Sequence, residues 1–392
     1  MSAASDLAMA DRTMQRDAPT WYAYLLLAYF TYLVSIQGNI IPYLQADLGL
    51  SYSQVSLHPS AIAVGTVFVG LFGDRLVRRI GRRPVLRISA LGAAGSALLL
   101  CLAPVVWASV AACLAMGLFG AFIPALVPAI LSDIHGPRRD IAYAESNALC
   151  YAFAIVAPLL VALAAAVGWN WRIGLVAGAA AGIAIALRFI ATPVPESHAP
   201  RESADAPLPP AFWAYWAMLA FGVALEFAAL LWAPAYFEKV IGLSPSAAAA
   251  GAGVFFAAML IGRTVGVRLF RLFSLRNLFF AAAITILVGF LAYWGSAVAA
   301  VAIAGLFVVG LGIANLFALI ISFAMAAAGP ASDRAATRTM IGPGLALLLT
   351  PPLLGTIADH AGLHTAQVMI PVFVALAAVS FFTAQALERR KA

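Results

Sequence analysis

The sequence predicts an all-α integral membrane protein of twelve transmembrane helices, arranged as two pseudo-symmetric six-helix bundles. Three observations support this prediction. Hydrophobic residues make up 64% of the 392 residues and charged residues only 10%, so the chain lacks the polar surface of a soluble protein. Twelve apolar segments are long enough to cross a hydrocarbon core of roughly 30 Å. Turn residues, charges and prolines also recur at a fixed offset of 193 residues.

The apolar segments define the organisation of the chain. They cover residues 20–46, 51–76, 84–103, 105–134, 139–167, 169–191, 210–238, 245–270, 277–295, 297–328, 333–359 and 365–387. Residues 1–18 are polar and lack the apolar core of a signal peptide, so we expect a cytoplasmic tail. The proline-rich stretch 192–209 is expected to be a cytoplasmic linker between the bundles 19–191 and 210–392, the second of which ends in a short basic tail.

The basic residues predict the orientation in the membrane. With the N-terminus inside, twenty of the 23 Lys and Arg residues face the cytoplasm, Arg172 and Lys239 lie outside, and Arg263 lies within a helix. An excess of basic residues is typical of cytoplasmic loops. We therefore expect a multi-pass protein of the cytoplasmic (inner) membrane with both termini inside. The net charge of +7 then needs no nucleic-acid partner.

The repeat relates the two halves position by position. An offset of 193 residues pairs Gly49 with Gly242, Ser51 with Ser244, Arg75 with Arg268, Arg83 with Arg276, Asp140 with Asp333 and Pro158 with Pro351. Glycines, charges and prolines match less often by chance than the alanines of apolar helices do. The pattern therefore indicates parallel repeats related by an axis along the membrane normal.

A charged hairpin joins the second and third segments. Its characteristic residues are Gly70, Asp74, Arg75, Gly81, Arg82 and Arg83. With this hairpin and the repeat, the chain resembles the major facilitator superfamily over essentially its whole length. The family signature has a Gly, then an acidic and a basic residue, then a Gly with basic pairs, and here four extra residues precede the second Gly. The resemblance implies a secondary transporter that works by alternating access.

The resemblance also implies a gate on the cytoplasmic side. Asp74 would contact the start of the eleventh helix, which carries Arg334 and Arg338 and offers unpaired backbone N–H groups. Gly70, one turn deeper, would let the two helices approach closely. We count the hairpin arginines with this gate. The alternative, that Asp74 is an ordinary surface charge, stays open.

A second gating pair is expected at intermediate depth. If helices 5 and 8 meet across the halves, as the resemblance implies, Glu145 and Arg263 lie at similar depths and can pair. A partly desolvated pair that breaks on opening biases a two-state equilibrium by ~1–3 kcal/mol. A solvated, interfacial Glu145 is the alternative.

Glu226 is the strongest candidate for a functional residue outside the hairpin. It lies near the middle of the seventh segment, where an ionised carboxylate costs at least ~2.5–3.5 kcal/mol on insertion scales. We therefore expect it to face the cavity, to pair with a cation or to carry a proton. The alternative is a neutral Glu226 that is hydrogen-bonded to a neighbouring helix.

Several polar and aromatic residues within the spans are candidate substrate ligands. They are Tyr32, Gln37, Asn39, Asn147, Trp232 and Asn315. The polar members could equally be interhelical contacts, which are common in membrane bundles.

These patterns favour a transporter of a small organic solute, with proton coupling through Glu226 and either symport or antiport. No nucleotide-binding loop, paired acids or metal-spaced histidines occur, so we expect no enzymatic activity, cofactor or metal. The expected partners are the solute, protons and the lipid bilayer, and we expect a monomer. A multidrug exporter of amphiphiles or cations is the alternative, followed by a lipid flippase and a non-transporting receptor.

Overall fold

The structure is a computed structural model that describes residues 15–195, 208–328, 335, 338, 339 and 341–389, and all regular structure within these residues is helical. Most of the predicted tail and linker, and Arg334 at the expected gate, lie outside the described residues.

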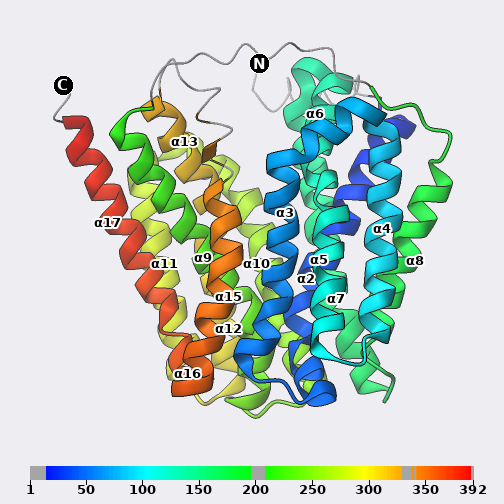
Figure 1. Ribbon diagram of the computed structural model, residues 1–392. Coiled ribbons are helices and arrows are strands. Elements are labelled where there is room, and N and C mark those ends of the chain that lie inside the picture. Colours follow the sequence, from blue (N-terminus) through cyan, green and yellow to red (C-terminus); the bar gives the residue numbers. More distant parts are fainter. Residues whose placement is uncertain (1–14, 196–207, 329–334, 336–337, 340, 390–392) are drawn as a thin grey trace.

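The helices form two bundles that stand side by side (Figure 1). The first contains α2 (Ala18–Leu48), α3 (Tyr52–Ile80), α4 (Arg82–Leu102), α5 (Val106–Gly120), α6 (Phe122–His135), η1 (Gly136–Arg138), α7 (Arg139–Ala166) and α8 (Ile173–Arg188). The second contains α9 (Pro210–Lys239), α10 (Pro245–Leu272), α11 (Leu275–Gly295), α12 (Ala299–Ile313), α13 (Leu316–Ala328), α15 (Ile341–Ala361), α16 (Leu363–Ala366) and α17 (Met369–Arg389). Helix α2 begins and α17 ends at the same end of the molecule, which we call the terminal end; the other is the far end.

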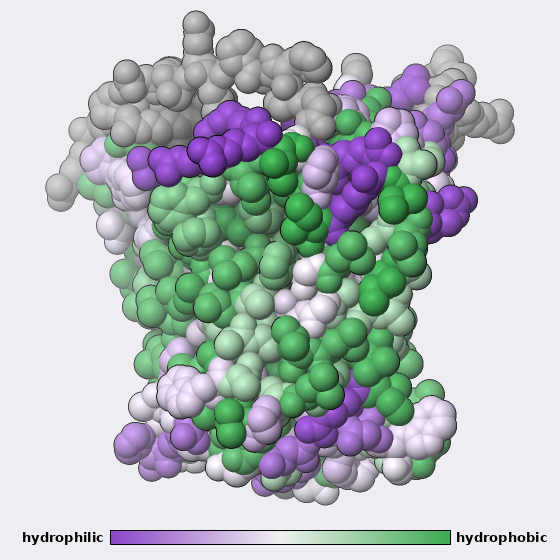
Figure 2. Space-filling view, turned by 45° about the vertical axis from the view of Figure 1, so that its right-hand side comes forward, coloured by the Kyte–Doolittle hydropathy of each residue, from purple (hydrophilic) through white to green (hydrophobic). Residues whose placement is uncertain are grey.

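The twelve expected membrane spans are confirmed. Within the described residues, eleven spans are long and apolar enough to cross a membrane, and α8 is a shorter apolar helix. Helices α5 and α6 together form one span, as do α12 and α13. On the face seen in Figure 2, a hydrophobic belt lies between hydrophilic residues at the two ends. The chain is therefore a multi-pass membrane protein.

The predicted repeat is visible in the helix boundaries. Helices α4 and α11 begin and end 193 residues apart, and so do α5 and α12. Even the break within the fourth span recurs, because Ala121 and Ala314 occupy equivalent positions between the two helical parts. Sequence periodicity does not reveal these breaks, since both parts of each span are equally apolar.

The turn residues of the repeat start equivalent helices. Ser51 caps α3 by accepting the Gln54 N–H, and its equivalent Ser244 caps α10 through Ala247. Such caps satisfy backbone donors that have no partner within the helix. The preceding Gly49 has φ 63°, a left-handed conformation that favours glycine.

The two bundles meet along three helix pairs. Helix α3 packs against α15, α7 against α10, and α2 against α9. At Gly38 in α2, an added Cβ would lie 3.0 Å from the carbonyl oxygen of Leu231 in α9. At Gly355 in α15, it would lie 2.6 Å from the carbonyl oxygen of Tyr52 in α3. Both close approaches lie toward the far end.

Candidate functional site

A carboxylate joins the two bundles at the far end. Asp359, near the end of α15, accepts hydrogen bonds from the backbone N–H groups of Tyr52 at 2.7 Å and Ser53 at 2.8 Å. These are the first residues of α3, whose N–H groups have no partner within the helix and carry its positive dipole end. We call this contact the far-end latch.

Aromatic packing accompanies the far-end latch. The ring of Trp232 in α9 meets that of Tyr52 edge-on at 5.7 Å, and Trp232 is only 1% exposed. Deeper in the same interface, the Ser60 hydroxyl donates to the carbonyl of Leu348 at 3.0 Å. Trp232 was expected in the cavity; in this structure it is buried where α9 meets the start of α3 at the far end.

At the terminal end, the expected gate residues take different positions. The side chain of Asp74 lies outside the described part, whereas Arg82 pairs with Asp133 and Arg83 donates to the carbonyl of Ile190. Both contacts stay within the first bundle. The Arg75 guanidinium lies over the Phe72 ring, and Arg338 offers its carbonyl to Trp216. A Cβ at Gly70 would have no neighbour within 4 Å, so no described helix approaches closely there.

The expected pair of Glu145 and Arg263 is replaced by two other contacts. Glu145 accepts hydrogen bonds from Arg16, at 2.6 Å from Nη2 to Oε1, 3.1 Å from Nε to Oε2 and 3.2 Å from Nε to Oε1. The Tyr24 hydroxyl donates to the same carboxylate at 3.0 Å. These three residues belong to the first bundle. The predicted pairing of Glu145 with Arg263 is wrong for this structure, because the Arg16 side chain binds Glu145 instead.

Arg263 instead takes part in a cluster that spans both bundles at intermediate depth. Its guanidinium carbon lies 4.8 Å from the ring centroid of Tyr151 in α7, a cation–π contact across the interface. Glu226 in α9 lies within electrostatic range of both Arg263 and Tyr151. Arg263 Nε is buried with no hydrogen-bond partner among the described residues. We call Tyr151, Glu226 and Arg263 the central cluster.

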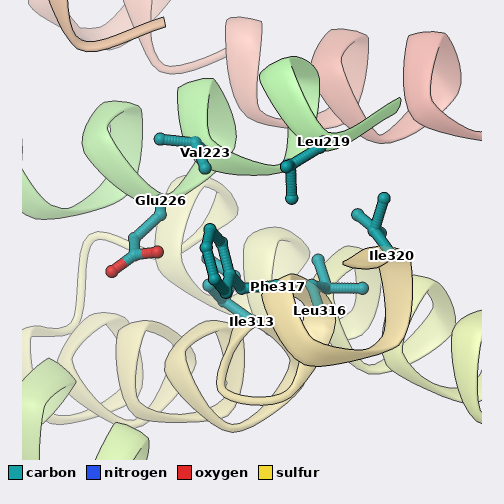
Figure 3. Close-up of a pocket in the computed structure, with 8 residues that line it drawn as sticks. Leu219, Val223, Glu226, Ile313, Leu316, Phe317 and Ile320 are labelled. Atoms are coloured by element: carbon teal, nitrogen blue, oxygen red, sulfur yellow. The ribbon is translucent and has the colours of Figure 1, made fainter. Parts of the chain in front are cut away.

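Glu226 also borders an apolar pocket between α9 and the break from α12 to α13. The pocket is lined by Leu219, Gly222, Val223, Glu226, Ile313, Leu316, Phe317 and Ile320. The carboxylate of Glu226 extends to one side of Phe317, away from Leu219 and Ile320 (Figure 3). The carboxyl group thus borders apolar side chains and also interacts electrostatically with Arg263.

The other expected substrate ligands make helix contacts. Side-chain donors bond backbone carbonyls as follows: Tyr32 to Gly174 at 2.6 Å, Gln37 to Leu33 at 3.1 Å, Asn39 to Ser35 at 3.3 Å, Asn147 to Tyr143 at 2.8 Å and Asn315 to Gly262 at 2.8 Å. The Tyr32 and Asn315 bonds join neighbouring helices, so we assign these two residues to packing. Sequence reasoning missed Tyr151, because the only available signal was an aromatic residue on the helix expected to face Arg263.

Comparisons with known proteins agree with this architecture. A family model described as Major Facilitator Superfamily matches residues 23–341. A bacterial homologue of the human lysosomal transporter Spinster, solved in an inward-facing conformation, has a similar structure, with a TM-score of 0.76, 15% identity and coverage of 95% of this chain and 98% of that chain. A search of curated proteins returned no match.

Two further solved structures are similar. The xylose transporter XylE from E. coli, in a partially occluded inward-open conformation, has a TM-score of 0.74, 14% identity and coverage of 93% of this chain and 97% of that chain. The nucleoside transporter NupG has a TM-score of 0.67, 14% identity and coverage of 94% and 98%. At such identities the likeness concerns the fold alone.

Proposed function

This chain belongs to the major facilitator superfamily, and on that premise we propose that it moves a small organic solute across the cytoplasmic membrane by proton-coupled alternating access. The observation that carries the proposal is the central cluster. Three helices from both bundles bring Glu226, Arg263 and Tyr151 together within the membrane. Ionisable side chains are costly at this depth, which is why they commonly mark transport pathways.

The cluster suggests how a proton is coupled to the alternation. When Glu226 is ionised it attracts Arg263, which also holds Tyr151 of the other bundle. Protonation of Glu226 removes that attraction, so the Arg263 guanidinium then interacts only with Tyr151 and the substrate. A change of charge in one bundle thus alters a contact between the two bundles, as a coupling residue must do.

The far-end latch fits an alternating gate. With the termini in the cytoplasm, as the distribution of arginines favours, the far end faces outward and Asp359 holds it closed. Asp74 would close the cytoplasmic end in the opposite state. In this proposal the described conformation opens its site to the cytoplasm.

An exporter of amphiphilic or cationic compounds is the second candidate. The apolar side chains beside Glu226 favour it, because an acid with apolar neighbours suits a lipophilic cation. Arg263 opposes it, since a cation nearby repels a positively charged substrate.

A ligand screen identifies the substrate and separates these candidates. The purified protein is heated with nucleosides, sugars, organic acids, amino acids and lipophilic cations, each in turn. A ligand at 100 times its Kd stabilises the folded state by ~2.7 kcal/mol, which raises the melting temperature measurably. Stabilisation by lipophilic cations alone would support the exporter.

The coupling role is then tested with Glu226→Gln in proteoliposomes. Gln keeps the shape and fixes the neutral form, so we expect exchange of labelled for unlabelled solute to persist while accumulation driven by a pH gradient is lost. Glu238→Gln, which alters another acid of α9 that pairs with Lys239, is the control and should accumulate solute normally. Accumulation by Glu226→Gln at the wild-type level would refute the coupling role.

A further inference from the structure

An apolar groove opens between α3 and α4 on the membrane-facing side of the first bundle. Both helices pack against α5 more extensively than against each other, which leaves a cavity of about 320 Å³ with α5 as its floor. Its lining residues are Phe68, Val69, Phe72, Gly73, Leu76, Val85, Ile88, Ser89, Ala115, Leu118, Phe119 and Phe122. Phe68 is 51% and Ile88 46% exposed, so the groove is open to the hydrocarbon phase. We call it the α3–α4–α5 groove.

One polar group lies inside this groove without a partner. Ser89 is 1% exposed and lines the groove, yet its hydroxyl makes no hydrogen bond among the described residues. Ser96, two turns further along α4, instead donates to the carbonyl of Gly92. A buried hydroxyl without a partner is unfavourable, so a ligand that brings an acceptor to Ser89 gains affinity.

Cations continue the groove toward the terminal end. Phe68, Phe72 and Leu76 lie on one face of α3, and on the same face Arg75 lies one turn after Phe72 and Arg79 one turn after Leu76. The Arg75 guanidinium lies 5.8 Å from the ring centroid of Phe72, so it stands at the mouth of the groove. Hydrophilic residues gather at this end above the hydrophobic belt (Figure 2).

The order of these groups along the membrane normal matches a phospholipid. Helices α3 and α4 run antiparallel from a shared turn, so at 1.5 Å per residue Ser89 lies about 3 Å deeper than Arg75. The apolar walls extend further inward to Phe68. By the same rise, Arg79, Arg75 and Ser89 follow one another inward beside the apolar walls, and only apolar walls continue beyond Ser89 to Phe68, in the order of phosphate, ester and acyl chain in a lipid.

We propose that the α3–α4–α5 groove binds one anionic phospholipid. Its phosphate pairs with Arg75 and Arg79, an ester carbonyl accepts the Ser89 hydroxyl, and one acyl chain fills the apolar channel. Guanidinium groups bind phosphate oxygens with charge-assisted hydrogen bonds, which favours an anionic headgroup over a zwitterionic one. Other lipids can cover the groove but lack this net attraction.

The headgroup is tested by native mass spectrometry of the purified full-length protein in equimolar phosphatidylglycerol and phosphatidylcholine with identical chains. We expect the wild type to retain one phosphatidylglycerol in preference. Arg75→Gln should lower the phosphatidylglycerol-to-phosphatidylcholine ratio about fivefold, the effect of one basic residue near a membrane surface. Arg268→Gln alters the repeat equivalent in the second bundle and should leave the ratio unchanged.

The groove itself is tested with two further variants. Ala115→Phe fills the floor of the groove and should abolish retention of both lipids. Ser89→Ala should weaken the binding of both lipids equally, because both lipids carry the same esters. A wild-type melting temperature confirms that each variant is folded, and Ala115→Leu replaces Ala115→Phe if the latter fails. The proposal is overturned if a folded groove-filling variant retains the lipid, or if Arg75→Gln and Arg268→Gln change the ratio alike.

Discussion

The two bundles share their helix boundaries but differ in the charges that they carry within the membrane. At the position of Glu226 the first bundle has Leu33, which is fully buried, and at the position of Arg263 it has Gly70. The first bundle contributes the aromatic ring of Tyr151 to the central cluster. The repeat therefore specifies the backbone, while the ionisable groups of the cluster are concentrated in one bundle. If the central cluster couples proton movement to transport as proposed, one charged bundle and one aromatic contact from the other bundle are sufficient for it.

The strongest test of this asymmetry is Arg263→Gln. If the second bundle supplies the charges of the central cluster, we expect transport to fall about a hundredfold, which corresponds to ~2.7 kcal/mol. Arg268→Gln, little more than one turn further along α10, is the control and should transport normally. Initial uptake rates in proteoliposomes provide the measurement.

The double variant Glu226→Gln/Arg263→Gln sharpens the same test. Groups that act as a unit are not additive, so the double variant should be no slower than Arg263→Gln alone. Additive losses would mean that the two residues act separately.

A smaller effect distinguishes the packing of the two bundles. A Cβ at Gly117 would lie 2.3 Å from the carbonyl oxygen of Ile62, whereas at the equivalent Gly310 the nearest atom is the Cβ of Ala258, at 2.8 Å. Neither the backbone of Ile62 nor the Cβ of Ala258 can move as the end of a flexible side chain does, but the approach at Gly117 is closer, so Gly117→Ala should cost ~2 kcal/mol of unfolding free energy and Gly310→Ala about 1 kcal/mol. Thermal unfolding in detergent measures both, and equal losses would show that the two crossings are equally tight.

A further test compares the carboxylates at the two ends of the α3–α15 pair, Asp359 and Asp74. Asp359→Asn removes a charge and one acceptor from the far-end latch, which should cost about 1 kcal/mol and raise the outward-open population roughly fivefold. Asp74→Asn should shift the population the other way.

Both shifts can be followed with one reporter. Ala148→Cys, on an exposed position of α7, is introduced into a protein without its native cysteines and labelled with an impermeant maleimide from either side. The two variants must change labelling in opposite directions; a shift in the same direction would contradict reciprocal gates.

The smallest expected effect concerns Glu145, whose repeat equivalent is Arg338. Its contact with Arg16 is about 30% exposed on both sides, so we expect a coupling energy of only ~0.5 kcal/mol. A double-mutant cycle of Arg16→Gln and Glu145→Gln, read by thermal stability, measures it. A coupling well above ~1 kcal/mol would make this contact a gate rather than a surface pair.

The sequence predicted the fold more completely than the site. Hydropathy and the repeat were sufficient for the spans, because the bilayer constrains length and composition strongly. Glu226 was singled out as a candidate for the same reason, since an acid within an apolar segment is conspicuous, and its role stays a prediction.

The contacts that the charged side chains make could not be predicted in the same way. Glu145 was paired with the wrong arginine because residue separation says nothing about which cation reaches a carboxylate. Asp359 was missed because its hydrogen bonds go to the backbone of α3, and a backbone N–H leaves no mark in a sequence.

That last property has an evolutionary consequence. The two backbone hydrogen bonds of the far-end latch need a carboxylate at position 359 but no particular side chain at positions 52 and 53, since every residue except proline supplies the N–H group. These two hydrogen bonds therefore survive substitutions of Tyr52 and Ser53 as long as the acid is retained. Among relatives, Asp359 should appear as a conserved residue that co-varies with no partner, and a substitution of Tyr52 or Ser53 should not be taken as loss of the gate.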